Sequence, residues 1–183
     1  KIGIDEAAFY GPKLDIQIKN VHGKEDTLIT IQIDMLLAKK FGMEYTDSND
    51  KRVTPYIIHR TSLGCYERTL ALVLEKFAGA LPLWMAPEQV RVLPIGVEHE
   101  EYAKAVRERL EAAGIRTEVD ARNEKIGYKI RQAQLEKVPY MLVVGEKEAA
   151  EGKVAVRNRG GVDLGAVSVD EFLLKALEEV RTL

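Results

Sequence analysis

Two segments in the first third of the chain alternate apolar and polar residues, as half-buried strands do. They are LDIQIK, residues 14–19, and LITIQID, residues 28–34. A third run, TPYIIHR at residues 54–60, follows the turn-rich DSND and predicts another strand. Beyond Gly64, apolar residues recur at positions that share one helix face, namely Tyr66, Leu70, Val73, Leu74 and Phe77. Strands followed by a helix predict an antiparallel sheet backed by that helix.

The segment GALPLWMAPEQ, residues 79–89, breaks both periodicities with two prolines and a glycine. A chain of 183 residues is long enough for two small domains. We therefore predict one domain over residues 1–86 and a second over residues 87–183.

The second half of the chain alternates strand-like and helix-like runs. Strands are predicted at residues 90–95, 115–120, 140–144 and 153–159, and helices at residues 98–114 and 124–138. Gly114 is a helix stop, and Ser168 with Glu171 has the capping-box spacing that opens a final helix. The order βαβαββα predicts a mixed, mostly parallel sheet, so the fold class combines α+β in the first domain with α/β in the second.

Composition places the chain among globular proteins with a buried core, since 46% of residues are apolar and 31% charged. No apolar run reaches the roughly 20 residues of a membrane span, so no membrane partner is expected. Cys65 is the single cysteine, which excludes an internal disulfide and fits a reducing cytoplasm. The N-terminus has neither a methionine nor a signal-like pattern, so we expect the chain to begin inside a longer protein.

Polar residues on the early strands are the first candidates for a site. Gln17, Thr30 and Gln32 share one face if the two strands pair, and they could form a polar floor for a small hydrophilic ligand. An open antiparallel sheet with one solvated face explains the same pattern.

Longer strings carry more information. EAAFYGPKLDIQIK, TIQID, YIIHRTSLGCYERTLALVLEKFAGALPLWMAPEQVRVLPI and DARNEKIGYKIRQAQLEKVPYMLVVGEKE occur in this order. Together they resemble threonyl-tRNA synthetases, which are class II aminoacyl-tRNA synthetases. The resemblance runs almost from end to end. It implies that the first domain is the C-terminal part of the catalytic domain, with class II motif 3, and that the second is the anticodon-binding domain.

The resemblance also implies site residues. Arg68, in GCYER, would be catalytic and lie against ATP, because an arginine stays charged, can stack and makes several donor contacts. His59 would be one zinc ligand, in a family site whose metal contacts threonine. The other ATP and threonine positions implied are Tyr10, Lys13, Thr30, Gln32 and Cys65. A lone histidine more often lies in a core or on a surface, and only the resemblance favours a ligand.

Two positions depart from the family pattern. Thr27 stands where many members have a glutamine that contacts ATP, which weakens the transfer of that contact. Cys65 stands at a motif 3 position that is commonly serine, so it is not a missing zinc ligand. Because the family's site needs three protein ligands and His59 is one, we expect the chain alone not to hold zinc tightly.

The net charge of −2 means that any argument for nucleic acid must be local. ARNEKIGYKIR carries Arg122, Lys125, Lys129 and Arg131, which an exposed, solvated helix face would also explain. The resemblance places anticodon contacts at Asn123, Lys125, Arg131, Glu148 and Arg157. Amide and carboxylate groups can read the edges of splayed bases, and arginine can stack or bind phosphate. Tyr128 is the nearby aromatic and could equally be packed in a core.

The sequence thus predicts a fragment of a threonine–tRNA ligase. The parent would use ATP with Mg²⁺ as substrate, zinc as a metal, and threonine and tRNA(Thr) as partners, and would form a homodimer. The fragment alone is expected to be inactive in threonine activation. Two alternatives stay open: a stand-alone tRNA-binding or regulatory paralogue without catalysis, and a generic α/β protein that binds a nucleotide. A paralogue should start with its own methionine, whereas the generic protein should bind ATP with no effect of tRNA.

Overall fold

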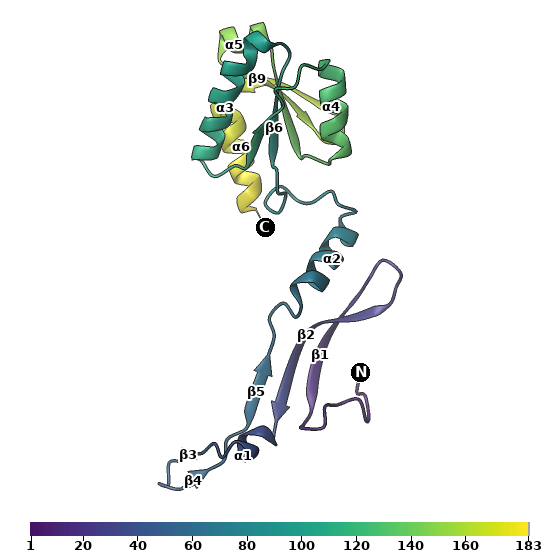
Figure 1. Ribbon diagram of the computed structural model, residues 1–183, viewed down its shortest axis with the longest axis vertical. Coiled ribbons are helices and arrows are strands. Elements are labelled where there is room, and N and C mark those ends of the chain that lie inside the picture. Colours follow the sequence, from purple (N-terminus) through teal and green to yellow (C-terminus); the bar gives the residue numbers. More distant parts are fainter. Residues whose placement is uncertain (183) are drawn as a thin grey trace. The chain divides into compact units, whose positions relative to one another are not determined.

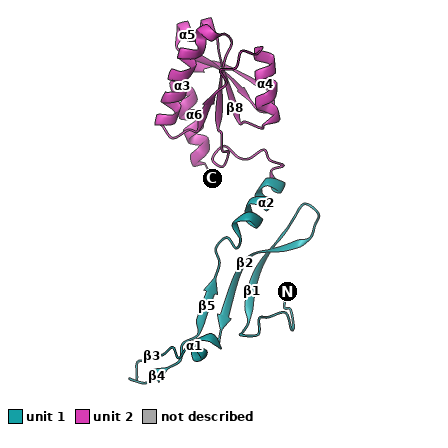
Figure 2. Ribbon diagram, in the orientation of Figure 1, with its two compact units in different colours: residues 1–76 teal, residues 77–183 magenta. Residues whose placement is uncertain are grey.

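The computed structural model describes residues 1–182 and divides into two compact units, Lys1–Lys76 and Phe77–Leu183 (Figure 2). We call them unit 1 and unit 2. No helix among residues 1–182 is long and apolar enough to cross a membrane.

Unit 1 is built on a three-stranded antiparallel sheet in the order β1-β2-β5 (Figure 1). Its strands are β1 (Lys13–Lys19), β2 (Glu25–Asp34) and β5 (Ile57–Arg60), and its one long helix is α2 (Tyr66–Lys76). A single short turn of helix and a small two-stranded hairpin, which the pattern did not predict, join β2 to β5; they are α1 (Leu37–Lys40), β3 (Tyr45–Thr46) and β4 (Arg52–Val53). The predicted antiparallel sheet and the helix after it are confirmed, but the expectation that this helix backs the sheet is wrong: no residue of α2 is buried, and Leu70 and Leu74 on its apolar side are 55% and 42% exposed.

The alternation of residues gives this sheet two different faces. Lys13 pairs with Gln32, Asp15 with Thr30, and Gln32 with His59, so these polar side chains share one face. The other face carries the apolar residues between them, namely Leu14, Ile16, Ile29, Ile31, Ile33 and Ile58. Four of those six are exposed, at 41–67% for Leu14, Ile16, Ile33 and Ile58. The apolar face of unit 1 is therefore open.

Unit 2 is a five-stranded sheet in the order β10-β9-β8-β6-β7 with helices on both faces (Figure 1). Its elements are β6 (Val90–Pro94), η1 (Val97–His99), α3 (Glu100–Ala112), β7 (Thr117–Val119), α4 (Ile126–Leu135), β8 (Tyr140–Val144), α5 (Glu146–Glu151), β9 (Lys153–Asn158), β10 (Asp163–Ser168) and α6 (Val169–Arg181). β7, β6 and β8 are parallel, whereas β9 and β10 are antiparallel to their neighbours. The mixed sheet is as predicted, with α5 and β10 as two further elements.

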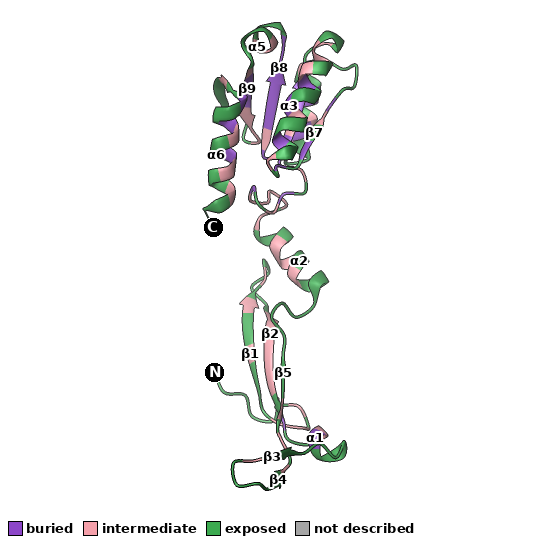
Figure 3. Ribbon diagram, turned by 90° about the vertical axis from the view of Figure 1, so that its left-hand side faces the viewer, coloured by how far each residue is buried: buried purple, intermediate pink, exposed green. Residues whose placement is uncertain are grey.

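Successive residues of the unit 2 strands face opposite helix layers. Val92, Leu142 and Val144 belong to a core with residues of α3 and α6, including Leu110 and Phe172. The intervening residues Leu93, Met141 and Val143 form a second cluster with Ile126, Ile130 and Ala133 of α4. Both clusters lie in unit 2, and Figure 3 shows the buried residues concentrated there. Burial on both faces is what the wholly apolar run YMLVV predicts.

Residues 77–88 are held by side chains of unit 2. Arg159 donates to the carbonyl oxygen of Leu81 at 2.6 Å, and Gln89 donates to that of Leu83 at 2.8 Å. Arg116 donates to the carbonyl oxygens of Trp84 at 2.8 Å and Ala86 at 3.0 Å. This segment therefore groups with unit 2, whereas the sequence places the domain boundary after residue 86.

Candidate functional site

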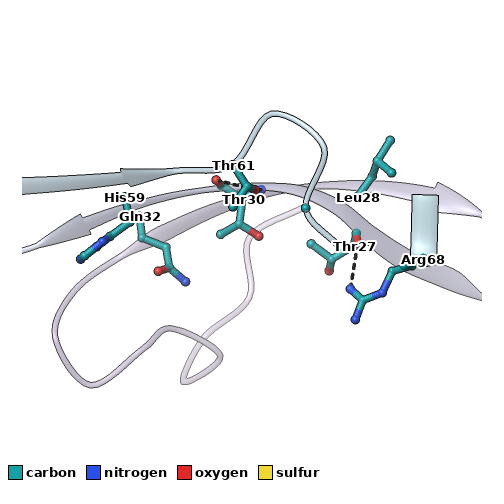
Figure 4. A pocket seen from close by; sticks show the side chains of 8 residues that line it. Thr27, Leu28, Thr30, Gln32, His59, Thr61 and Arg68 are labelled. Carbon is teal, nitrogen blue, oxygen red and sulfur yellow. Dashed lines mark hydrogen bonds between the residues drawn. The ribbon is translucent and has the colours of Figure 1, made fainter. Parts of the chain in front are cut away.

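The polar face of the unit 1 sheet forms one wall of a pocket of about 260 Å³ (Figure 4). Its lining comes from β2, β5, the loop after β5 and the first turn of α2. It comprises Thr27, Leu28, Thr30, Gln32, His59, Thr61, Gly64 and Arg68. Four predicted site residues, Thr30, Gln32, His59 and Arg68, are therefore brought together in one hollow.

Gly64 allows the loop after β5 to pass close to β2. Its φ is +66°, and a Cβ placed on it would lie 2.5 Å from the carbonyl oxygen of Leu28. Both the backbone conformation and the close approach favour glycine. Beyond this turn, Arg68 Nη1 donates to the carbonyl oxygen of Thr27 at 3.2 Å, which fixes the guanidinium at the pocket edge (Figure 4).

The strand floor is a hydrogen-bonded network. Thr30 Oγ1 donates to Asp15 Oδ1 at 2.8 Å, and Lys13 lies 2.9 Å from the other oxygen of the same carboxylate. The hydrogen bond from Lys13, followed by that from Thr30, holds the pKa of the Asp15 carboxyl below its ordinary value. Tyr10 Oη donates to Gln32 Oε1, which orients the amide toward the pocket. Predicted residues Tyr10 and Lys13 therefore act on pocket residues without lining the pocket themselves.

Asp34 is a functional candidate that the sequence reasoning missed. It is fully buried, accepts hydrogen bonds from the Leu36 and Leu37 amides, and lies 2.9 Å from His59 Nε2. Burial alone would raise the pKa of this carboxyl, but the Leu37 amide, His59 and the Leu36 amide together outweigh it and hold the pKa low. The sequence could have indicated Asp34, because it is a carboxylate at the end of an alternating strand and lies on the same face as Thr30 and Gln32.

Cys65 does not line the pocket. It is exposed, and its thiol donates to Glu67 Oε2 at 2.7 Å. Thr61 is a lining residue that the sequence reasoning missed, and its Oγ1 accepts a hydrogen bond from the Thr30 amide at 3.1 Å. Gln17, predicted to extend the polar floor, donates to Thr27 Oγ1 at 3.0 Å across a bulge in the β1–β2 pairing.

In unit 2, a small hollow lies where β6 and β7 end. It is lined by Pro94, Ile95, Gly96, Val97, Glu100, Ala121, Arg122, Asn123, Glu124 and Lys129. Asn123 lies in it, and Lys125 follows as the residue that caps the start of α4. The carboxyl ends of parallel strands are where α/β sheets commonly bind ligands.

The remaining predicted anticodon residues approach this region from other elements. Glu148 of α5 accepts a hydrogen bond from the Gly145 amide, and Gly145 abuts Ile95 of the hollow. Arg157 pairs with Met141, whose side chain packs under α4, so Arg157 projects from the α4 face of the sheet. Its guanidinium donates to Asp163 at 2.8 Å. Arg131 is exposed on α4.

One member of the basic cluster is not on an exposed helix face. Lys129 is 3% exposed, and its Nζ donates to the carbonyl oxygen of Pro94 at 2.9 Å. An exposed, solvated helix face therefore does not explain Lys129. Its long side chain turns inward at the end of β6, where its ammonium group donates to the Pro94 carbonyl.

Both units of the chain match known proteins. Residues 2–77 match the class II tRNA synthetase core domain for glycine, histidine, proline, serine and threonine, and residues 89–179 match an anticodon binding domain. The chain is 58% identical over 178 residues to a threonine–tRNA ligase of Clostridium botulinum, covering 97% of this chain. It is 50% identical over 177 residues to threonine–tRNA ligase 1 of Bacillus subtilis, covering 96% of this chain.

The chain belongs to the threonyl-tRNA synthetase family.

A solved structure supports both the family and the fold. The crystal structure of the RNA binding domain of the threonyl-tRNA synthetase from Cryptosporidium parvum matches with a TM-score of 0.84 and 37% identity, covering 95% of this chain and 44% of that one. The chain spans 28% of the length of the two bacterial ligases. It therefore carries a part of what a whole threonyl-tRNA synthetase contains.

Among residues 1–182, no group of three or more histidine, cysteine, aspartate or glutamate side chains could hold a metal ion. His59 offers one imidazole, held by Asp34 through Nε2, in the way carboxylates orient ligating histidines. Structural zinc needs four ligands and catalytic zinc three from the protein.

Proposed function

We propose that the protein to which this chain belongs joins threonine to tRNA(Thr) with ATP, and that unit 2 recognises the anticodon arm. The single observation that carries the proposal is the match to threonine–tRNA ligases over nearly the whole chain, through both units. That match does not support the alternative of a generic nucleotide-binding α/β protein. The alternative of a paralogue without catalysis stays open, since its sequence could match as well.

In this proposal unit 1 supplies part of the ATP and threonine site. Arg68 stands at the pocket edge as a permanent cation suited to a polyphosphate. Gln32 and Thr30 offer amide and hydroxyl groups for a small polar substrate. His59 would donate one nitrogen to a zinc ion, whose Lewis acidity could hold the amino and hydroxyl groups of threonine. The chain alone should neither retain stoichiometric zinc after dialysis nor catalyse threonine-dependent pyrophosphate exchange.

Unit 2 would bind RNA through the α4 face and the hollow at the ends of β6 and β7. Lys125 and Arg131 are exposed cations suited to phosphate contacts, which position RNA without reading sequence. Asn123, Glu148 and Arg157 carry groups that can pair with base edges. In the free protein, Arg157 donates a hydrogen bond to Asp163, and Glu148 accepts one from the Gly145 amide. Both side chains would therefore exchange a hydrogen-bond partner in the protein for one in the RNA.

The test is a titration of the full chain with two labelled RNA stem-loops, one with a threonine anticodon and one with a changed anticodon. We expect preference for the first, with affinity falling as salt rises, because phosphate contacts release counterions. Arg157→Ala should cost about 1–3 kcal/mol for the threonine anticodon and remove most of the preference. Arg109→Ala, on α3 across the sheet, is the matched control and should change neither. Equal binding of both RNAs, unaffected by Arg157→Ala, would contradict the proposal.

A further inference from the structure

A guanidinium and an aromatic ring are held together beside the unit 2 hollow. The Cζ atom of Arg122 lies 5.8 Å from the centroid of the Tyr128 ring. This is within the range at which a cation is attracted to the ring face. Both side chains are accessible, since the Arg122 side chain is 52% exposed and Tyr128 is 45% exposed. Tyr128 is therefore not a core residue, although its sequence position allowed that.

Asp120 holds the guanidinium group of Arg122 in place. Its Nε donates to Asp120 Oδ1 at 2.8 Å and its Nη2 donates to Oδ2 at 2.6 Å, so the carboxylate grips the guanidinium with both oxygens. Asp120 is itself only 8% exposed and also accepts the Arg122 amide. This bidentate interaction keeps the guanidinium plane in one orientation. Less conformational entropy is therefore lost when a ligand stacks on it.

The side chains around Arg122 suit a flat, uncharged ring better than a phosphate group. Ile95 and Val97 line the same hollow as Arg122 and are 50% and 65% exposed, which leaves apolar surface beside the cation. Asn123 lies next to it with an amide that can meet a base edge. The charge of Arg122 is already matched by Asp120, so its remaining asset is its planar face.

We propose that Arg122, gripped by Asp120 and backed by Tyr128, is a stacking platform for one unpaired nucleobase of the RNA loop. The inference rests on the proposed function, since it requires that unit 2 bind RNA. It assigns a role to two residues outside the predicted anticodon set. Stacking tolerates any base, so the platform would add affinity and hold one nucleotide in place while residues such as Asn123 and Arg157 read others.

The experiment uses the full chain and the stem-loop with the threonine anticodon, with 2-aminopurine placed in turn at each unpaired loop position. Fluorescence of 2-aminopurine falls when the base stacks. With the unchanged chain, one position should be quenched on binding. Arg122→Lys keeps the charge but loses the plane, and Tyr128→Leu keeps apolar bulk but loses the ring. Each should weaken binding about tenfold, within the cost of losing one stacked base, and abolish that quenching.

Three controls separate stacking from other effects. Tyr128→Phe keeps the ring and should retain affinity and quenching. Arg109→Lys matches Arg122→Lys, because Arg109 is also paired with an aspartate and its side chain is 53% exposed, and it should change nothing. The dependence of affinity on salt should keep its slope in Arg122→Lys, since no charge is lost. Urea unfolding of each variant reports whether the fold is retained.

The outcomes are distinguishable. If the unchanged chain binds no RNA, the proposed function fails and the platform fails with it. If the chain binds but Arg122→Lys and Tyr128→Leu bind equally well, the platform alone is overturned. Weaker binding with quenching retained also overturns it, because the two residues would then act on loop order and not as a surface for a base.

Discussion

Unit 1 and unit 2 differ in how their polar sites are supported. The unit 1 pocket stands on a sheet whose opposite, apolar face is open, and among its described residues only Asp34 and Ala38 are buried. The unit 2 hollow stands on a sheet covered on both faces, with Leu93 and Leu142 fully buried in opposite layers. Side-chain networks can therefore arrange a site, but burial of apolar surface is what stabilises the sheet beneath it.

An open sheet and a covered sheet differ in how stable each is by itself. Hydrogen bonds such as that from Thr30 to Asp15 contribute about 1 kcal/mol each, because water competes for the same groups. An uncovered sheet with a few such bonds is marginal in water. We therefore expect unit 2 to keep its structure by itself, and unit 1 to need apolar cover on its open face.

The largest effect should come from the unit 2 core. Phe172→Ala removes a side chain that is 2% exposed and packs against Tyr140, and it should lower the free energy of unfolding by about 3–5 kcal/mol. Leu174→Ala, on the same helix but 70% exposed, should change it by about 0.5 kcal/mol or less. Urea unfolding followed by circular dichroism measures both. Similar effects of the two changes would mean that unit 2 has no more of a core than unit 1.

The segment before β6 tests where the stable unit begins. A chain of residues 77–183 should be more stable than one of residues 87–183 by about 2–4 kcal/mol, since the shorter chain loses buried Leu83 and the carbonyl partners of Arg116 and Arg159. Thermal unfolding of the two purified chains provides the comparison. Equal stability would favour the boundary after residue 86 that the sequence predicts.

Lys129 distinguishes a structural cation from an RNA-binding one. Lys129→Ala removes a buried donor to the Pro94 carbonyl and should destabilise unit 2 by about 2 kcal/mol. The salt slope of RNA binding should stay unchanged, because a buried ammonium makes no phosphate contact. Lys104→Ala, at an exposed position of α3, is the control for stability. A shallower dependence of RNA affinity on salt in Lys129→Ala would instead indicate that Lys129 contacts the RNA.

The smallest effect concerns pH. The hydrogen bond from Arg122 holds the pKa of the Asp120 carboxyl below its ordinary value of 3.8. A depressed folded-state pKa gives stability that is present above the unfolded value and is lost as pH falls through the folded one. Asp120→Asn should therefore lower the urea midpoint at pH 7, and the difference from the unchanged chain should shrink as the pH falls below 3.8. At pH 7, Asp170→Asn should lower the urea midpoint less than Asp120→Asn does, because Asp170 and its partner Arg109 are both exposed.

Much of both folds follows from residue patterns. The alternation in LDIQIK and LITIQID predicts β1 and β2 and the shared face of Thr30 and Gln32, and Gly114 ends α3 with a φ of +87°. The two further elements of unit 2 have weak signals. β10 contains Gly165 at a φ of +88° and a register shift, and α5 has six residues, too few for a helical period.

The pattern of apolar and polar residues could not predict contacts between residues that are far apart in the sequence. Nothing local separates buried Lys129 from exposed Arg131, since the two differ only in which side of α4 they occupy. The bond between His59 and Asp34 spans two strands whose pairing register had to be known first. Resemblance to the family named His59 and Arg68 as site residues, but their supports Asp34 and the Thr27 carbonyl came from the structure.

Amide hydrogen exchange of the full chain, with and without the threonine-anticodon stem-loop, tests the contrast between the two units most directly. In the free chain, the amides of β6 and β8 should exchange slowly and those of β1, β2 and β5 quickly, because only the former lie in a covered sheet. Bound RNA should slow exchange at residues 120–131 and 145–150 and leave residues 13–34 and 57–68 unchanged. Slow exchange in the unit 1 strands of the free chain, or RNA protection that falls on unit 1 instead, would contradict the account.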